Sequence, residues 1–264
     1  MIGAIIGDIS GSKYEFNNIR SKDFNIFDQD CKFTDDTVLT CAVAKSILDC
    51  EGEYSNLDQM VIKNFREFVK KYPNAGYSDT FKAWATSQNP EPYHSIGNGA
   101  AMRISPVAYV ARDLDELKTL CYKVTSITHN SEEALIGAEA VASAIFLARK
   151  GYSKSEIEKF ITTHYYKLDY DLDSLQKYYK TYLNCKDSCP QAIFCFLEGN
   201  TFEDVIKTAI SIGGDSDTIA AIAGSIACEF FPVLNSYKEK ALSYLPDELK
   251  QIYYDFDEKI IKNS

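Results

Sequence analysis

Two acidic segments, far apart in the sequence, carry the residues best suited to chemistry. Residues 33–37 read FTDDT, and residues 213–218 read GGDSDT. Each segment supplies two carboxylates and further oxygen donors, and hard cations such as Mg²⁺ and Mn²⁺ prefer oxygen ligands of this kind. The two glycines allow a sharp backbone turn, so that Asp215 and Asp217 can converge on one centre. The pattern therefore indicates a site for divalent cations.

Each acidic segment also has a simpler interpretation, because each stands at the start of an apolar run. Asp and Thr favour helix N-termini, where they accept hydrogen bonds from free backbone N–H groups and complement the helix dipole. A cap needs only one side chain, however, whereas each segment offers several oxygen donors. If both segments precede buried helices, they can meet at one mouth of a bundle and hold two ions roughly 4 Å apart.

The elements expected to position these segments are helices, because apolar residues recur at helical spacing and no series of alternating segments is present. The expected helices span residues 38–47, 60–69, 114–127, 132–150, 155–163, 202–212 and 218–230. The last of these is apolar or small nearly all round, which places it in the middle of a bundle. Residues 73–106 are rich in Pro, Gly and Asn and are expected to be mostly irregular. Long irregular segments in compact domains often carry function.

Composition limits the class of protein. The chain has 264 residues, of which 45% are hydrophobic, and this suffices for one sizeable core. We expect one domain over residues 1–264. The net charge of −10 disfavours nucleic acid as a large partner. No stretch approaches the roughly 18 apolar residues of a membrane span, and the N-terminus lacks the features of a signal peptide.

These features predict a cytoplasmic location, where the eight cysteines are expected to be thiols. The closest group of them, Cys185, Cys189 and Cys195, fits no common zinc spacing. The glycines of residues 3–11 superficially resemble a dinucleotide-binding loop. They lack the GxGxxG spacing and a following βαβ pattern, so we reject that interpretation.

Four motifs along the chain occur in the order of a known family. They are residues 7–15 (GDISGSKYE), 33–37 (FTDDT), 97–103 (GNGAAMR) and 213–220 (GGDSDTIA). Over residues 2–228 the chain resembles the ADP-ribosylglycohydrolases, which include the enzyme that reactivates dinitrogenase reductase and the vertebrate ADP-ribosyl-acceptor hydrolases. The resemblance implies an all-α fold, a single compact orthogonal helical bundle with a two-metal centre at one mouth.

The resemblance also implies roles for individual residues. The catalytic carboxylates would be Glu15 and Asp35, and which of them accepts the proton stays open. Two divalent cations, Mg²⁺ or Mn²⁺, would be bridged by Asp217 and held by Thr34, Asp35, Asp36, Asp215, Asp217 and Thr218. ADP-ribose would be bound by Ser95, Gly97, Asn98, Gly99, Ala100, Met102 and His129. The aromatic residue that stacks on adenine is left open among Tyr14, Phe16, Tyr77, Trp84 and Tyr93.

Some of these residues have a plainer structural interpretation. Asn98 followed by Gly99 is by itself a turn signal. His129 by itself would more often be a structural histidine, and Arg103 can pair with a carboxylate of the acidic surroundings.

An acidic chain also needs local positive charge for a diphosphate, which cations, helix N-termini and loop amides would supply.

The predicted function is that of a metal-dependent hydrolase that cleaves the glycosidic bond between ADP-ribose and a modified acceptor. Bond cleavage builds oxocarbenium-like charge at the anomeric carbon, which carboxylates and cations help to stabilise. The acceptor stays open: an arginine, a serine, another side chain, a small molecule or an ADP-ribosylated nucleobase. Alternatives are another metal-dependent hydrolysis of a phosphate-bearing substrate, or a silent ADP-ribose-binding or structural member, since the resemblance extends to a lens crystallin. The complete set of ligand positions favours an enzyme.

Overall fold

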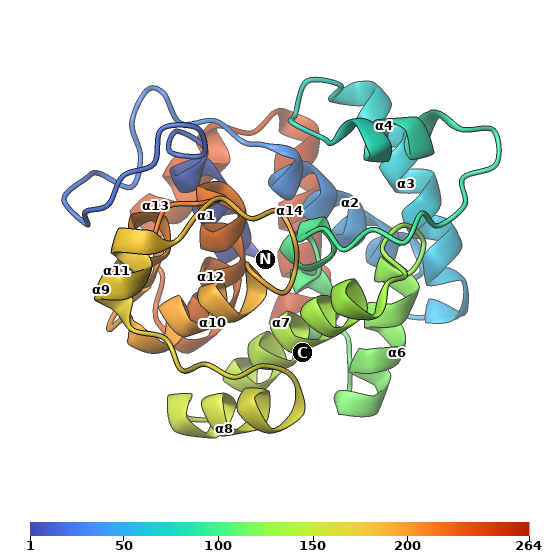
Figure 1. The fold of residues 1–264 in the computed structure, drawn as a ribbon. Helices are drawn as coiled ribbons and strands as arrows, with labels where there is room; N and C mark the ends of the chain where they lie inside the picture. Colours follow the sequence, from blue (N-terminus) through green and yellow to red (C-terminus); the bar gives the residue numbers. More distant parts are fainter. Residues whose placement is uncertain (264) are drawn as a thin grey trace.

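Helices make up the regular structure of residues 1–263, which the computed structural model describes. No strand occurs in that part of the chain, and Gly97 and Asn184 form an isolated β-bridge. The all-α prediction is therefore confirmed. Figure 1 shows helices that cross one another at many angles around a common centre, the arrangement of an orthogonal bundle.

All seven expected helices are present. They are α2 (Asp35–Asp49), α3 (Leu57–Lys71), α6 (Leu114–Thr125), α7 (Glu132–Arg149), α8 (Lys154–His164), α11 (Phe202–Ser211) and α12 (Ser216–Phe230). Several begin directly after a side chain that accepts a backbone N–H of the first turn, for example Thr34 before α2 and Thr201 before α11. The capping interpretation of residues 33–37 is thus correct for Thr34, and it leaves the carboxylates of that segment free for another role.

Seven further α-helices and three 3₁₀ segments are not predicted by the sequence pattern. They are α1 (Ile2–Gly11), α4 (Asp79–Thr86), α5 (Gly99–Met102), α9 (Leu172–Tyr178), α10 (Cys189–Glu198), α13 (Asn235–Ser243), α14 (Asp247–Lys259), η1 (Tyr54–Asn56), η2 (Ser105–Tyr109) and η3 (Ile261–Asn263). Helices α4 and α5 lie within residues 73–106, and the larger part of that segment is irregular, as expected. Helix α1 is buried on every side, which removes the one-sided periodicity by which a helix is recognised.

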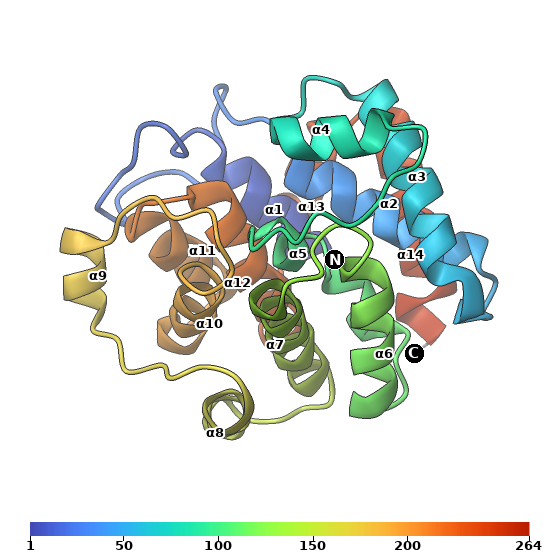
Figure 2. The same ribbon diagram turned by 45° about the vertical axis from the view of Figure 1, so that its right-hand side comes forward.

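Helix α1 packs against α12 at very short range. A Cβ atom on Gly3 would lie 1.9 Å from the carbonyl oxygen of Gly224, and one on Gly7 would lie 2.1 Å from that of Ala220. The small residues of both helices therefore let the two backbones touch. The prediction that residues 218–230 lie in the middle of the bundle is confirmed, since α12 also packs against α7, α10 and α11 (Figure 2).

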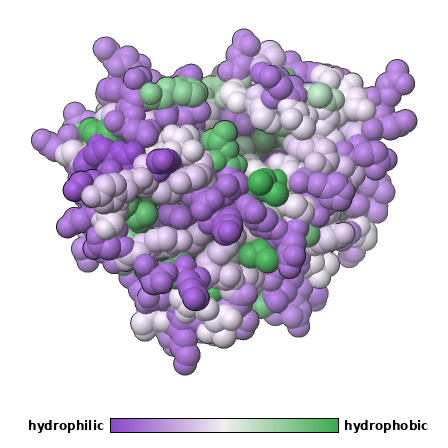
Figure 3. All heavy atoms as spheres, viewed as in Figure 1, coloured by the Kyte–Doolittle hydropathy of each residue, from purple (hydrophilic) through white to green (hydrophobic). Residues whose placement is uncertain are grey.

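The surface of the bundle is mostly hydrophilic on the face viewed in Figure 1, and its hydrophobic groups are scattered (Figure 3). The buried hydrophobic side chains join into one cluster that runs through the helices. The eight cysteines are free. None of the described helices has both the length and the apolar character that a bilayer-spanning helix requires.

Candidate active site

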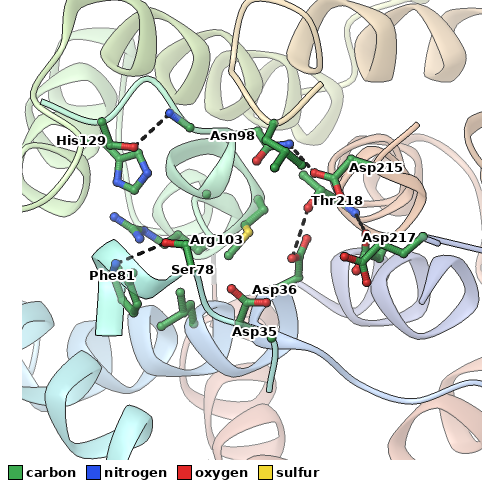
Figure 4. Close-up of a pocket in the computed structure, with 18 of the residues that line it drawn as sticks. Asp35, Asp36, Ser78, Phe81, Asn98, Arg103, His129, Asp215, Asp217 and Thr218 are labelled. Atoms are coloured by element: carbon green, nitrogen blue, oxygen red, sulfur yellow. Dashed lines mark hydrogen bonds between the residues drawn. The ribbon is translucent and has the colours of Figure 1, made fainter. Parts of the chain in front are cut away.

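A cavity of about 330 Å³ opens where helices α2 and α12 begin. Figure 4 shows Asp35 and Asp36 on one side of it, Asp215, Asp217 and Thr218 on another with Asn98 beside Asp215, and His129 on the far side. The cavity is lined by Glu15, Asp35, Asp36, Leu39, Gly76, Ser78, Phe81, Tyr93, Ser95, Gly97, Asn98, Gly99, Met102, Arg103, His129, Leu183, Asp215, Asp217 and Thr218.

The structure brings together all but two of the predicted catalytic, metal-binding and ADP-ribose-binding residues, the aromatic candidates for adenine apart. Thr34 and Ala100 are not among the lining residues. Ala100 is buried behind the cavity wall in α5. The hydroxyl of Thr34 donates a hydrogen bond to Asp8 Oδ1 at 2.7 Å, on the side of α1.

Asp8 is a buried carboxylate for which the sequence motif gave no role. Its Oδ2 accepts the backbone N–H groups of Thr34 at 2.9 Å and of Thr37 at 3.1 Å. Burial raises the pKa of Asp8, and the hydrogen bonds from Thr34 and Thr37 oppose this rise. A lone carboxylate within the apolar run of residues 2–9 was the available signal, because a buried carboxylate needs partners.

Carboxylates from three segments converge in the cavity. Oxygens of Glu15, Asp215 and Asp217 lie within 4.8 Å of one another. The hydroxyl of Thr218 donates to Asp36 Oδ2 at 3.3 Å, which joins the start of α12 to the start of α2 (Figure 4). The two acidic segments of the sequence therefore form one cluster, to which the loop after α1 adds Glu15.

The Gly213–Gly214 turn places Asp215 and Asp217. Both glycines have positive φ angles, 71° and 78°, a region that glycine enters without steric cost. The side-chain amide of Asn18 accepts from the Gly214 N–H at 2.8 Å and donates to the Gly214 carbonyl at 2.9 Å. The Arg20 guanidinium donates to the carbonyl oxygens of Ile212 and Tyr179. Asn18 and Arg20, which no sequence motif identified, thus tie the loop that carries Glu15 to this turn.

The carboxylate cluster has an excess of negative charge. Burial, assisted by neighbouring carboxylates, raises the pKa of Glu15 and of Asp35 to about 7. The same causes raise the pKa of Asp36 and Asp217 well above the usual range. Within residues 1–263, no Lys or Arg nitrogen forms an ion pair with these four side chains.

Asp36 Oδ1 in this cluster is buried without a hydrogen-bond partner. An unpaired buried carboxylate oxygen is costly, and a cation would supply the missing partner. All the donors are oxygens, which suits Mg²⁺ or Mn²⁺. The residues present therefore fit divalent cations.

One wall of the cavity is formed by the loop of residues 95–99. The Asn98 N–H donates to the Leu183 carbonyl at 2.9 Å, and the Cys185 N–H donates to the Ile96 carbonyl at 2.9 Å. The Asn98 side chain donates to Asp215 Oδ2 at 2.6 Å, which links this loop to the carboxylate cluster. Residues 183–185, which no motif identified, therefore fix the loop from outside, and Leu183 lines the cavity.

Of the five aromatic residues considered for adenine, only Tyr93 lines the cavity. Tyr77 and Trp84 are buried and stack on Phe81, which itself lines the cavity, and Phe16 is 82% exposed. Gly76 lies against Asp35, since a Cβ atom there would lie 2.9 Å from Asp35 Oδ1. Its φ angle of 115° also favours glycine.

The suggestion that Arg103 pairs with a carboxylate is wrong. Its side chain is fully buried, and no carboxylate oxygen within residues 1–263 lies in ion-pair range of it. The guanidinium carbon lies 4.6 Å from the ring centroid of Phe65 and 5.8 Å from that of Phe81. Its Nη2 donates to the Thr128 hydroxyl at 2.7 Å.

Comparison with known proteins identifies the family. The family model described as ADP-ribosylglycohydrolase matches residues 1–228 of this chain. The chain belongs to the ADP-ribosylglycohydrolase family. The resemblance found in the four sequence motifs is thereby confirmed.

Relatives within and near this family are distant in sequence. ADP-ribosylhydrolase ARH3 of Mus musculus is 26% identical over 260 residues, which cover 75% of this chain and 69% of that protein. ADP-ribosylarginine hydrolase Tri1 of Pseudomonas putida (strain GB-1) is 26% identical over 162 residues, 57% of this chain and 42% of its own. The solved structure of an ADP-ribosylglycohydrolase-related protein complex matches with a TM-score of 0.71 at 20% identity, over 97% of this chain and 95% of that one. This structural likeness supports the ADP-ribosylglycohydrolase fold.

Proposed function

We propose that this protein is a metal-dependent hydrolase that cleaves the glycosidic bond between ADP-ribose and a modified acceptor. The acceptor is a protein side chain such as arginine or serine, or a related small-molecule conjugate. The observation that carries the proposal is the convergence of six acidic and amide side chains on one cavity, in a member of this family. They are Glu15, Asp35, Asp36, Asn98, Asp215 and Asp217. Relatives named for ADP-ribosyl hydrolysis support the same class of reaction.

Two divalent cations would be held by the acidic cluster. The proposed ligands are Thr34, Asp35, Asp36, Asp215, Asp217 and Thr218. Bound there, the cations would supply positive charge for the ribose hydroxyls and lower the pKa of a water molecule. Asp217 is the proposed bridging ligand, because it lies close to carboxylates of both acidic segments. Its oxygens group with those of Glu15 and Asp215, and its pKa is raised by burial and then by Asp215 and Asp36.

Glu15 and Asp35 are the proposed acid–base residues. Each lines the cavity, and each has a pKa raised to about 7 by burial and by neighbouring carboxylates. In the metal-free protein such a carboxyl group can both accept and release a proton at physiological pH, and bound cations would lower its pKa. Glu15 is the better candidate for the proton acceptor, because Asp35 is also a proposed ligand and a bound cation would hold it ionised.

The loop side of the cavity is proposed to bind ADP-ribose. The contacting residues would be Ser95, Gly97, Asn98, Gly99, Met102 and His129, with Ala100 supporting the loop from behind. Tyr93 is the proposed partner of adenine, because it alone among the five aromatic candidates lines the cavity. Asn98 would couple this loop to the cluster through its hydrogen bond to Asp215.

Thermal shift measurements with ADP-ribose, ADP and phosphate, each with and without Mg²⁺, test the substrate class. A ligand at 100 times its Kd stabilises the folded state by about 2.7 kcal/mol, which raises Tm by roughly 5–10 °C for a chain of this size. ADP-ribose should give the largest rise, and Mg²⁺ should increase it, since the cations would hold the second ribose. Equal stabilisation by ADP under every condition would favour a general nucleotide-binding role.

Hydrolysis is tested on a panel of defined ADP-ribosyl linkages. We expect release of ADP-ribose from at least one linkage, abolished by a chelator and restored by Mg²⁺ or Mn²⁺. Binding of ADP-ribose without turnover on any linkage would instead favour a catalytically silent member of the family.

A further inference from the structure

A buried row of three side chains lies behind the loop wall of the cavity. Arg103 Nη2 donates to the Thr128 hydroxyl at 2.7 Å, and the Thr128 hydroxyl lies 2.7 Å from His129 Nδ1. The exposed fractions of Arg103, Thr128 and His129 are 0%, 0% and 5%. The row therefore connects a buried cation to a histidine that lines the cavity.

The chemistry of the three groups fixes the direction of the second hydrogen bond. A guanidinium can only donate, so Thr128 Oγ1 accepts from Arg103. Thr128 Oγ1 has a second lone pair and could also accept from an Nδ1–H, but its own buried proton would then have no acceptor, since none other than His129 Nδ1 is found among residues 1–263. Nδ1 is thus the acceptor, and a neutral imidazole must carry its proton on Nε2.

His129 Nε2 faces the loop that we propose to bind ADP-ribose. It lies 3.3 Å from a Cβ atom built on Gly97 and 3.5 Å from one built on Gly99. A Cβ atom at Gly97 would crowd Nε2, and one at Gly99 would be in van der Waals contact with it, whereas the glycines leave Nε2 uncovered on this side. Within the described chain Nε2 has no hydrogen-bond partner of its own, so its N–H is free for a ligand.

The surroundings of His129 keep the ring neutral. Burial lowers its pKa well below the usual range, and the charge of Arg103 adds to this effect. The other ring packed against it is Tyr93, with the centroids 5.9 Å apart, and no carboxylate within residues 1–263 pairs with it. A neutral donor is suited to an oxygen acceptor, and the lowered pKa keeps the ring uncharged at neutral pH.

We propose that Arg103 and Thr128 are positioning residues that hold His129 as a neutral Nε2–H donor to an oxygen of bound ADP-ribose. The identity of the ligand rests on the proposed function, whereas the tautomer rests on the hydrogen bonds alone. The buried Arg103 Nε and Nη1 have no hydrogen-bond partner, so the guanidinium is held chiefly by the aromatic rings and by Thr128. This arrangement gives a reason for a buried arginine that pairs with no carboxylate.

The tautomer is measured by ¹⁵N NMR of the imidazole nitrogens in the free protein. The chain has three histidines, and His94 and His164 are exposed, so substitution of each by Asn assigns the remaining signals to His129. We expect one non-protonated Nδ1 and one protonated Nε2 for His129. Thr128→Val removes the hydroxyl at nearly constant shape and should mix or invert the tautomers, while Thr128→Ser should keep the wild-type pattern.

Affinity for ADP-ribose is measured on the same variants by calorimetry. Loss of one well-placed hydrogen bond weakens binding by about tenfold, so Thr128→Val should raise Kd by about that factor and Thr128→Ser should restore it. Arg103→Met should act in the same direction; if it does not fold, Thr128→Val alone decides.

A wild-type Nδ1–H tautomer, or a Thr128→Val protein with unchanged tautomer and Kd, would overturn the proposal. A wild-type protein with no affinity for ADP-ribose would overturn the ligand assignment together with the proposed function. The ¹⁵N NMR spectrum of the free protein would still show which nitrogen of His129 carries the proton.

Discussion

Asp8 of helix α1 accepts two hydrogen bonds from Thr34, one from its backbone N–H at 2.9 Å and one from its hydroxyl at 2.7 Å. Helix α1 therefore holds the start of α2, which carries Asp35 and Asp36. The same helix lies in backbone contact with α12, whose first turn carries Asp217. One buried helix thus sets the position of both acidic segments.

Replacement of Asp8 by Ala should destabilise the protein. It removes three hydrogen bonds and leaves the N–H groups of Thr34 and Thr37 without their buried partner. Each buried unsatisfied group costs about 1–3 kcal/mol. Part of this cost is offset, because alanine does not carry the desolvation penalty of the buried carboxylate. We expect the free energy of unfolding in urea to fall by about 2 kcal/mol. Asp23→Ala, at an exposed aspartate, is the control and should change it little; equal values for the two variants would contradict this role of Asp8.

Asp217→Asn and Asp35→Asn should each lower turnover on the order of 10²-fold or more, because each removes a proposed cation ligand or proton acceptor. The fold should persist, since the loss of one carboxylate relieves repulsion in the metal-free cluster. Far-UV circular dichroism checks the fold, and Asp115→Asn, at an exposed position on α6, is the matched control. Near-normal kcat in both variants would exclude these assignments.

Stability of the metal-free protein should depend on pH through the carboxylate cluster. The pKa of Asp35 rises from 3.8 to about 7 in the folded protein, so the folded state binds the proton more tightly than the unfolded chain. The contribution of this group to stability is fully present below about pH 4 and is lost as pH rises to about 7. In EDTA, the fall in Tm between pH 5 and pH 8 should therefore be larger for the wild type than for Asp35→Asn. Added Mg²⁺ should remove the fall, and identical profiles for both proteins would argue against a charged cluster.

Gly7→Ala should disrupt the contact between α1 and α12. The new Cβ atom would lie 2.1 Å from the Ala220 carbonyl oxygen, a backbone atom that cannot move without its helix. Overpacking of this kind costs about 1–3 kcal/mol or more. Gly151→Ala is the comparison, because its Cβ atom meets nothing within 4 Å and only its φ angle of 81° is unfavourable. Urea denaturation should show the larger loss for Gly7→Ala; the reverse order would contradict the close-packing explanation.

Local sequence was sufficient for the helices with one buried face. Helices α3 and α11 were predicted because polar and apolar residues alternate around them with the helical period. Helix α1 was missed because all ten of its residues are buried, and a helix buried on every side leaves no periodic signal. Helix α4 was missed because Pro and Gly on both sides suggested an irregular segment, although Ser78 caps it in the ordinary way.

The sequence by itself determined which groups could bind cations, because carboxylates and hydroxyls at close spacing carry that chemistry wherever they are placed. It also determined the family, since four motifs in one order specify it. Only the tertiary structure decided that Asp8 holds Thr34, that Asn18 and Arg20 hold the Gly213–Gly214 turn, and that Arg103 reaches His129 through Thr128. Asp8 and Thr34 are 26 positions apart in the sequence, and Asn18 and Gly214 are 196 positions apart. Contacts of that range depend on how the helices pack, and no local pattern of residue types encodes the packing.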